Sequence, residues 1–491
     1  MKKWVCILLS ALLLVGVLAG CGSTPAASSS SAASSSSTAS SSKASSSAAS
    51  SSSAAASSST GKTITVNFYS TVGAYKDMLE ARVEKFNTEV GPSKGIKINL
   101  TTEIDNPSTV FDTMVKSGNV PDIWSASESN MQKYEDQGLL MDLNTVSQLK
   151  DLVAEYKPYD SEGRTSHNGK VYALALEILP IKLAYNKDLF KAAGIVDDKG
   201  EAKAPTTWDE VIADAKKITD AGNGTSYGFG YSFGGWNWGV HRLLFAPWIA
   251  STGTGWFNNT TLKYDFEAFR PALNYMMSLA KDKSYFPGIE TIDIDPIRAQ
   301  FSDGKVGMEI SPAYDIAVFN DQFPATCDWD IAEVPVQDPN NRYKGVQIFR
   351  GAYSMWSGVT ADKLDAVSEV FKYLSADEFY EDLYANCKII PANTELMSKV
   401  SKTADKTGWK NMSANADQYV NSPRFPDGQL TLEGDDMETV VNDMVAGNIS
   451  VDDVIKQLTD TYQSALDTAV KDGKVKLDEY KLADDYYKWT K

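Results

Sequence analysis

The sequence predicts an α/β protein of two lobes, with mixed sheets flanked by helices. Two observations lead to this class. Near the start of the globular part, period-two strand patterns at 63–69 and 96–100 enclose a helical pattern at 75–90, an order that favours parallel strands. Farther along, helix-rich stretches are interrupted by a strand pattern at 306–310, so the chain is expected to cross between lobes more than once.

Three strands are expected at the start of the first lobe. Alternating apolar residues over 63–69 give the first strand one apolar face. The following helix is expected to break at Gly91, because Pro92 stands beside it. A short helix over 110–116 then leads to a third strand pattern at 121–124, which completes the parallel arrangement.

The middle of the chain combines a buried strand segment with a well-marked helix. Residues 169–186 contain two apolar runs separated by Glu177. Thr207 and Glu210 have the spacing of a capping box, and the helix that they begin is expected to end at Gly222. Further helices are expected at 266–281, 365–374, 437–446 and 451–470, and no internal repeat is visible.

The first residues have the pattern of an export signal, in which two lysines precede a short apolar run that ends in small residues. The stretch 18–21, Leu-Ala-Gly-Cys, resembles the lipobox of bacterial lipoproteins. This resemblance implies that residues 1–20 are a signal peptide and that Cys21 carries acyl chains such as palmitate; an ordinary signal peptide or an uncleaved anchor are the alternatives. The remainder of 21–61 is almost entirely Ser and Ala and predicts a disordered tether with an end-to-end distance of about 30–35 Å.

Charge and composition exclude several classes of protein. The formal net charge of −17 argues against nucleic acid as a partner, because such partners require a basic face. Only two histidines, His167 and His241, are present, which removes most routes to a histidine metal site or a Ser-His-Asp triad. Once the signal is removed and Cys21 is lipidated, Cys327 and Cys387 remain, and they either pair or stay as buried thiols.

Six stretches, in this order along the chain, resemble the extracellular solute-binding proteins of ABC importers, in the carbohydrate-binding class that includes maltose-binding protein. They are Asn119–Ile123, Gln137–Leu140, Gly169–Glu177, Ala184–Phe190, Pro205–Glu210 and Phe301–Met308. The resemblance covers residues from about 62 to 470. It departs from the family at Tyr314, where Trp is frequent, and in a tail over 475–491 that extends past the usual end.

The resemblance implies a periplasmic-binding-protein-like fold with a hinged cleft between the lobes. Lobe 1 is expected to contain 62–177 and 311–360, and lobe 2 to contain 178–310 and 361–491. The implied function is to capture a sugar or oligosaccharide and deliver it to the permease subunits of an ABC importer, with no enzymatic step and no cofactor. The protein is expected to be a monomer, held by its lipid on the outer face of the cell membrane of a Gram-positive-like bacterium.

The main ligand-binding candidates are aromatic, amide and acidic side chains. Sugars stack their C–H faces on aromatic rings, and a glycine-rich loop carries Trp236, Asn237 and Trp238. The alternative is a tryptophan pair packed beneath a loop. Glu177 interrupts an apolar run where the family often has a sugar-bonding acid, and the alternative for it is a structural salt bridge.

The remaining candidates follow strands or lie near the expected cleft. Loops at the carboxyl ends of parallel strands commonly carry binding residues. On this ground, or by the resemblance, the candidates are Glu128, Tyr69, Ser70, Tyr314, Gly351, Tyr353 and Arg424. Trp248 and Trp256 stand in apolar contexts and are expected in the core.

Other functions remain as alternatives at this stage. A surface-anchored glycoside hydrolase needs only two carboxylates and aromatic platforms, and the chain has 64 Asp and Glu residues. An esterase is disfavoured, because the G-x-S-x-G pattern at 230–234 is followed by a glycine-rich loop. No metal site is expected, since Asp293 and Asp295 lack the spacing of a calcium loop. An adhesin or sensor would have the same sequence features.

Overall fold

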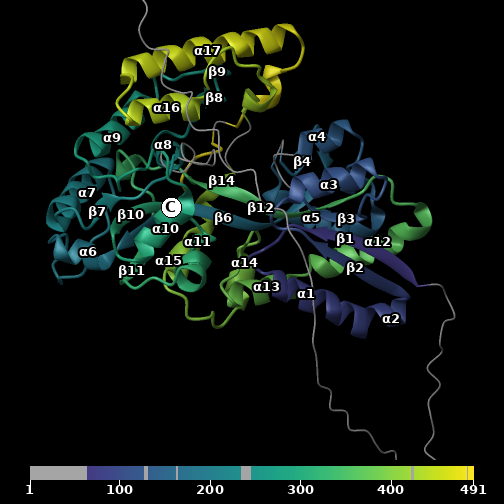
Figure 1. Cartoon of the computed structure of the whole chain (residues 1–491). Coiled ribbons are helices and arrows are strands. Elements are labelled where there is room, and N and C mark those ends of the chain that lie inside the picture. Colours follow the sequence, from purple (N-terminus) through teal and green to yellow (C-terminus); the bar gives the residue numbers. More distant parts are fainter. Residues whose placement is uncertain are drawn as a thin grey trace, which may run out of the picture. The chain divides into compact units, whose positions relative to one another are not determined.

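The computed structural model describes residues 63–126, 131–161, 164–233, 245–421, 425–483 and 485–490. One large sheet organises these residues (Figure 1). From edge to edge its strands are β2 (Ile96–Thr102), β1 (Ile64–Ser70), β3 (Ile123–Ala126), β12 (Gly345–Met355), β6 (Ala173–Asn186), β10 (Val306–Pro312) and β7 (Tyr227–Phe229). Shorter strands join this path, namely β11 (Trp329–Ala332), β13 (Ile390–Pro391) and β14 (Tyr419–Asn421).

The first three strands confirm the expected parallel arrangement. β1 pairs in parallel with β2 along its whole length and with β3 at Phe68 and Tyr69. The expected break at Gly91 is wrong, because the short helix α2 (Gly91–Lys94) begins there. Pro92 lies in its first turn, where a proline loses no hydrogen bond. The chain leaves this helix at Gly95, whose φ of 64° is in the left-handed region.

Two long strands connect the halves of the sheet. β6 and β12 pair antiparallel from Gln347↔Pro180 to Ser354↔Ala173. β6 then continues and pairs antiparallel with β10, Ser311 lying opposite Lys182. All fourteen residues of β6 are buried, which explains its two apolar runs. We call β6 and β12 the crossing strands, because β6 carries the sheet from β12 to β10.

Helices surround the sheet in the order that the sequence indicated. In the first part of the chain they are α1 (Lys76–Lys85), α3 (Pro107–Lys116), α4 (Met131–Asp136), α5 (Lys150–Tyr156), α6 (Lys187–Ala192), α7 (Trp208–Gly222), α8 (Ala246–Thr252), α9 (Arg270–Lys281), α10 (Ile294–Ser302) and α11 (Asp315–Ala317). Later come α12 (Ala361–Leu374), α13 (Asp377–Ala385), α14 (Glu395–Lys399), α15 (Trp409–Ser413), α16 (Met437–Val445) and α17 (Val451–Lys471). Two hairpins complete the set, β4 (Ser166–His167) with β5 (Lys170–Val171) and β8 (Phe257–Asn258) with β9 (Lys263–Tyr264).

Helix α7 confirms the capping box that its sequence predicts. The Thr207 hydroxyl accepts a hydrogen bond from the Glu210 amide at 3.1 Å, and the Glu210 carboxylate accepts one from the Thr207 amide at 3.3 Å. The helix ends at Gly222, as expected, and Asn223 follows in the left-handed region. Both ends are therefore set by local chemistry.

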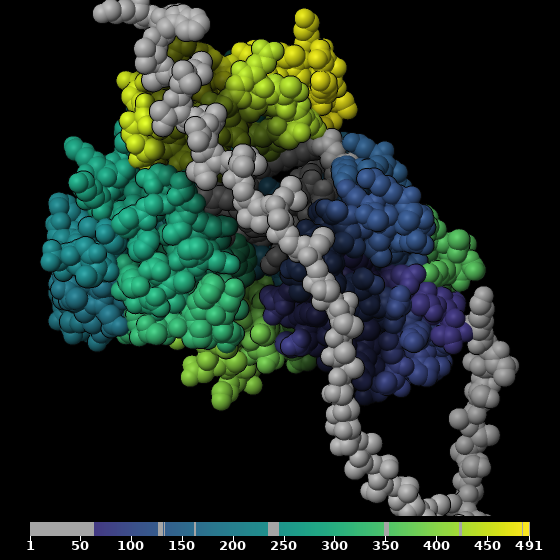
Figure 2. All heavy atoms as spheres, in the orientation of Figure 1, coloured from purple at the N-terminus to yellow at the C-terminus, as the bar shows by residue number. Residues whose placement is uncertain are grey.

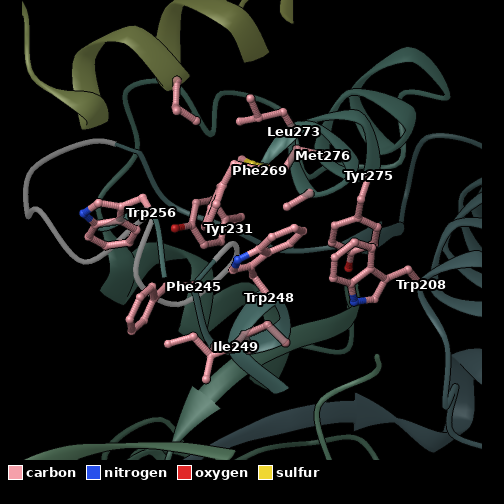
Figure 3. Packing of buried hydrophobic residues seen from close by; sticks show 14 of the residues in the cluster. Trp208, Tyr231, Phe245, Trp248, Ile249, Trp256, Phe269, Leu273, Tyr275 and Met276 are labelled. Carbon is pink, nitrogen blue, oxygen red and sulfur yellow. The ribbon is translucent and has the colours of Figure 1, made fainter. Parts of the chain in front are cut away.

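Two apolar clusters of buried residues define the lobes. In Figure 2 the purple start of the described chain and its teal middle form separate masses on the visible face. The second-lobe cluster contains Trp248 and Trp256, so the expectation that both lie in the core is confirmed (Figure 3). In the same cluster Trp208 stacks on Tyr275 with ring centroids 5.2 Å apart. Helices α16 and α17 cover this cluster through one apolar face each.

The first-lobe cluster contains a part of the chain that the expected boundaries placed in lobe 2. Val66 of β1 and Leu79 of α1 pack with Phe371 of α12 and Tyr380 of α13. Residues 361–396 therefore differ from the expected assignment. Their helical pattern reveals an apolar face but not which sheet that face meets. A third cluster, with Phe301, Trp329 and Trp409, joins α10, β11 and α15.

The tail after α17 packs onto the folded chain. The backbone carbonyl of Tyr487 accepts a hydrogen bond from the Lys344 amide at 2.8 Å, just before β12. Thr490 donates to the side-chain oxygen of Gln418 at 3.0 Å through both its amide and its hydroxyl. The Arg342 guanidinium lies 5.0 Å from the ring centroid of Trp489. The tail thus attaches the second lobe's last segment to the start of a crossing strand.

The two cysteines are free thiols in the structure. Cys387 donates to the Ala404 carbonyl, and burial raises the pKa of both Cys327 and Cys387 to about 11. Of the two states left open by the sequence, the structure has the unpaired one. Within the described ranges, no helix has both the length and the apolar character needed to cross a membrane.

Candidate functional site

A hollow lies at the carboxyl ends of β1 and β3, beside the crossing strand β6. Its lining comes from five separate segments of the chain. The lining residues are Thr71, Val72, Ala74, Tyr75, Ser125, Glu177, Leu179, Tyr314, Lys388 and Ile389. Parallel strands all point their carboxyl ends at the same edge, which is why loops that are distant in sequence meet there.

Local hydrogen bonds shape the loop after β1. The Ser70 hydroxyl accepts from the Val72 amide at 3.2 Å, and the Ser125 hydroxyl accepts from the Thr71 amide at 3.4 Å. Tyr75, which begins the following helix, is buried against Phe379. One side of the hollow is therefore formed by the loop after β1, which these hydrogen bonds hold in place, and by Tyr75.

Glu177 lies on the crossing strand and lines the hollow, although the residue is only 4% exposed. Its backbone pairs with Arg350 of β12 and with Pro391 of β13. Its negative charge reinforces the effect of burial in raising the pKa of Tyr353 and of Tyr380. A carboxylate at this depth is a strong acceptor for hydroxyl groups, because little water competes for it.

The second lobe and the β13 segment close the hollow. Tyr314 stands between β10 and α11, is half-buried, and lines the open space. Lys388 and Ile389 approach from the segment between α13 and β13. The residues that line the hollow thus include an acid, a lysine, a threonine, a serine and two tyrosines. These groups suit a ligand with many hydroxyls and apolar C–H faces.

Three of the expected candidates are buried and contact other parts of the folded chain. Tyr69 is 1% exposed, its hydroxyl donates to the Pro107 carbonyl at 2.8 Å, and burial with the charge of Glu103 raises its pKa to about 12. Tyr353 is buried edge-on against Phe68, since it shares a face of β12 with first-lobe core residues. Ser70 is fully buried and holds the loop after β1. As ligand contacts, Tyr69, Ser70 and Tyr353 stay predictions.

Glu177 and Tyr314 are the expected candidates that the structure brings together at the hollow. Gly351 lies on β12, next to the residue that pairs with Glu177. Trp236, Asn237, Trp238, Glu128 and Arg424 lie outside the described residues, as does Cys21. These six therefore stay predictions.

Sequence reasoning missed most of the lining. Thr71 directly follows β1, and Ser125 is the next-to-last residue of β3, so the strand-end rule that selected Tyr69 and Ser70 also applies to these two. The helical pattern at 75–90 indicates an apolar face for Tyr75 and no role at the hollow. Lys388 and Ile389 follow α13, and no motif in that part of the chain indicates that they reach the first strand's loop.

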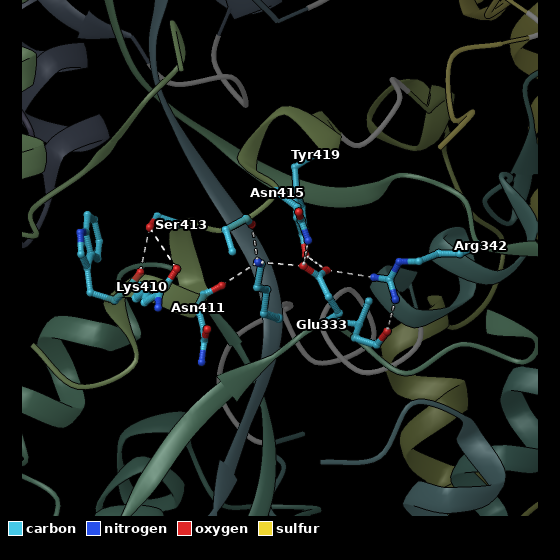
Figure 4. A network of polar contacts seen from close by, with 11 residues as sticks. Glu333, Arg342, Lys410, Asn411, Ser413, Asn415 and Tyr419 are labelled. Atoms are coloured by element: carbon cyan, nitrogen blue, oxygen red, sulfur yellow. Dashed lines mark hydrogen bonds and ion pairs between the residues drawn. The ribbon is translucent and has the colours of Figure 1, made fainter. Parts of the chain in front are cut away.

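A polar network supports the crossing strand on its second-lobe side (Figure 4). The ammonium of Lys182 is 1% exposed and donates to Glu333 at 3.0 Å and to the carbonyls of Asn411 and Ala414 at 2.8 and 2.7 Å. Arg342 donates to the other Glu333 oxygen at 3.1 Å. Burial alone would raise the pKa of Glu333, but the charges of Lys182 and Arg342 bring it below its ordinary value.

Among the described residues, no group of three or more His, Cys, Asp and Glu side chains is arranged to hold a metal ion. His167 instead contacts Glu135, with Nδ1 2.7 Å from the carboxylate.

One sheet that joins two apolar cores through long crossing strands, with a polar hollow beside one of them, is the architecture of two-lobed α/β binding proteins. The family model described as bacterial extracellular solute-binding protein matches residues 74–380. The chain belongs to this family. Its members are binding proteins found outside the cytoplasmic membrane.

Solved structures share this fold. The GacH receptor of Streptomyces glaucescens, solved unliganded and with acarbose, is 20% identical with a TM-score of 0.63, covering 82% of this chain and 98% of that chain. RafE from Streptococcus pneumoniae is 19% identical with a TM-score of 0.63, covering 82% and 98% of the two chains. At this level of identity the likeness establishes the two-lobed fold alone.

The alignments with curated relatives cover only part of each chain. The sn-glycerol-3-phosphate-binding periplasmic protein UgpB of Yersinia enterocolitica is 25% identical over 312 residues, which are 61% of this chain and 65% of that protein. The UgpB of Brucella melitensis is 24% identical over 228 residues, which are 45% of this chain and 49% of that protein. The chain therefore spans about half to two thirds of the length of these curated relatives.

Proposed function

We propose that this protein captures a sugar or oligosaccharide in the hollow beside β6 and delivers it to the permease subunits of an ABC importer. The observation that carries the proposal is that the buried acid Glu177 lines the same space as Tyr314, Thr71 and Ser125. A pyranose presents hydroxyls around its edge and C–H groups on its faces. Carboxylate and hydroxyl groups bind the first, and aromatic rings bind the second.

The known binding proteins support this substrate class. The GacH receptor was solved with acarbose, RafE with raffinose, and MalE from Bdellovibrio bacteriovorus with maltotriose. We propose that Trp236, Asn237, Trp238, Glu128 and Arg424 extend the site beyond the described residues. Glu128 would add a second carboxylate to that of Glu177, and the two indoles would add stacking surfaces.

The chemistry of the described lining favours binding over hydrolysis. Glycoside hydrolysis uses two carboxyl groups on either side of the scissile bond. The described lining residues contain one carboxylate, that of Glu177. A glycoside hydrolase therefore remains only an outcome of the test below.

We propose further that the protein is a monomeric lipoprotein on the outer face of the cell membrane of a Gram-positive-like bacterium. The support is the Leu-Ala-Gly-Cys stretch ending at Cys21, followed by a long Ser/Ala-rich segment. Two acyl chains hold a protein stably to a bilayer, whereas one does not. We expect Cys21→Ala to move the protein from the membrane fraction to the soluble fraction. Full membrane retention of this variant would contradict the anchor.

The function is tested by screening the protein from Gly61 onward against raffinose, maltotriose, acarbose, common monosaccharides and sn-glycerol-3-phosphate. We expect a carbohydrate to raise the melting temperature and to bind with one-to-one stoichiometry in calorimetry. If only sn-glycerol-3-phosphate binds, the carbohydrate proposal is contradicted and the ligand is a phosphorylated polyol. Release of shorter sugars, followed by chromatography, would indicate the hydrolase.

A further inference from the structure

We propose that Arg298 is a positioning residue that orients Tyr314 toward the hollow and thereby raises the affinity for carbohydrate. The inference rests on the proposed function for the role of Tyr314, but the contact itself is independent of any ligand. Arg298 is not among the residues that line the hollow. It acts through the ring that does.

The guanidinium of Arg298 is held firmly from two sides. One amino group donates to Asp315 Oδ1 at 2.5 Å, and the other donates to Asp295 Oδ1 at 2.8 Å. The Arg298 side chain is 9% exposed and that of Asp315 is almost completely buried. A planar guanidinium with two carboxylate partners has one orientation, whereas an ammonium group does not define a plane.

This fixed guanidinium lies 5.6 Å from the centre of the Tyr314 ring. That distance is within the range in which a cation is attracted to the face of an aromatic ring. Tyr314 also directly precedes Asp315 in the chain, so the same arginine contacts the ring and the adjacent residue. The loop between β10 and α11 is thereby restrained at the point where it meets the hollow.

A restrained ring favours binding, because the ligand does not have to order it. Immobilising one free side chain on binding lowers affinity by about 2- to 10-fold, so the restraint contributes about the same factor. We expect Arg298→Lys to lose this factor for whichever of raffinose, maltotriose or acarbose binds. The lysine keeps the charge but loses the planar contact with both aspartates.

Arg82 provides a matched control in the first lobe. Its side chain is also 9% exposed, it pairs with Glu378 at 2.8 Å, and it lies 3.9 Å from the centre of the half-buried Tyr373 ring. Neither Arg82 nor Tyr373 lines the hollow. Arg82→Lys therefore removes the same kind of contact between two residues that do not line the hollow.

The experiment measures the Tyr314 ring directly and the affinity separately. The protein is labelled with 3-fluorotyrosine, and Tyr314→Phe identifies the Tyr314 fluorine resonance. We expect Arg298→Lys to shift or broaden that resonance and Arg82→Lys to leave it unchanged. Asp295→Asn, at a side chain that is half-exposed, removes the negative charge of one arginine partner at little cost in folding and should give a smaller change in the same direction.

The outcomes separate this inference from the proposed function. An unchanged Tyr314 resonance in folded Arg298→Lys and Asp295→Asn overturns the positioning role, whatever binds. Equal losses of affinity in Arg298→Lys and Arg82→Lys overturn it as well, since they indicate a general loss of stability. If the resonance changes but no carbohydrate of the screen, monosaccharides included, binds the wild-type protein, the positioning contact is upheld and the carbohydrate function fails.

Discussion

Two acidic residues near the crossing strand β6 show how the same side-chain chemistry serves different ends. Glu333 receives hydrogen bonds from Lys182 of β6 itself and from Arg342, Asn415 and Tyr419 in later segments of the chain. Glu177 is on the strand itself and lines an open hollow. The carboxylate of Glu333 is enclosed by protein donors and stabilises the fold, whereas Glu177 lines the space in which we propose that a ligand binds. The difference lies in the geometry around the group and not in the residue type.

The largest effect on stability is expected at Lys182, the buried lysine that donates to Glu333. We expect Lys182→Met to lower the free energy of unfolding by about 3 kcal/mol, because it leaves Glu333 and two buried carbonyls without their shared donor. Urea denaturation followed by tryptophan fluorescence measures the loss. Lys133→Met, which removes a surface pair with Asp112, should cost less than about 1 kcal/mol. Equal costs for the two variants would mean that the network does not support the strand.

The next prediction compares the loss of negative charge at Glu177 with the same loss at Glu333. We expect Glu177→Gln to weaken carbohydrate binding by about 10- to 100-fold, the usual range for losing a charge-assisted hydrogen bond, with most of the stability kept. Glu333→Gln should do the reverse, lowering stability and leaving the affinity within about twofold. Calorimetry with raffinose or maltotriose and thermal melting on the same preparations provide both numbers. A Glu177→Gln protein that binds normally would remove Glu177 from the site.

The third prediction concerns acid. The charges of Lys182 and Arg342 hold the pKa of Glu333 below its ordinary value of 4.5, so the ionised form contributes stability that is present above pH 4.5. That contribution is lost as the pH falls through the lowered pKa. We therefore expect the difference in unfolding free energy between wild type and Glu333→Gln to shrink below pH 4.5. A constant difference between pH 7 and pH 3 would contradict this account.

The smallest expected effect is at the tail. The ring centroid of Trp489 lies 5.0 Å from the guanidinium of Arg342, which donates a hydrogen bond to Glu333. We expect Trp489→Ala to lower the unfolding free energy by about 0.5–1 kcal/mol, the usual size of an exposed cation–π contact. The affinity for carbohydrate should not change. Repeating the substitution in Arg342→Lys should show a reduced effect, and full additivity would mean that the two residues act separately.

The site was harder to predict than the fold, and individual residues show why. Glu177 could be selected because a charge in an apolar run has few roles, and Tyr314 because it follows a strand near the expected cleft. Tyr69 satisfied the same strand-end rule, yet its ring packs against Phe111. A position at the end of a strand limits where a side chain is, but the neighbouring helix determines whether the side chain is covered.

The sequence by itself determined the local elements, the parallel start of the sheet, the capping box of α7, the helix pair α16 and α17, and the burial of Trp248 and Trp256. These follow from periodicity and from contacts within a few residues of chain, which a sequence records directly. Only the tertiary structure decided that α12 and α13 join the first lobe, that Lys388 reaches the hollow, and that Cys327 and Cys387 stay apart. Each of these depends on which apolar face meets which sheet across hundreds of residues, and many partners satisfy one face equally well until the whole chain packs.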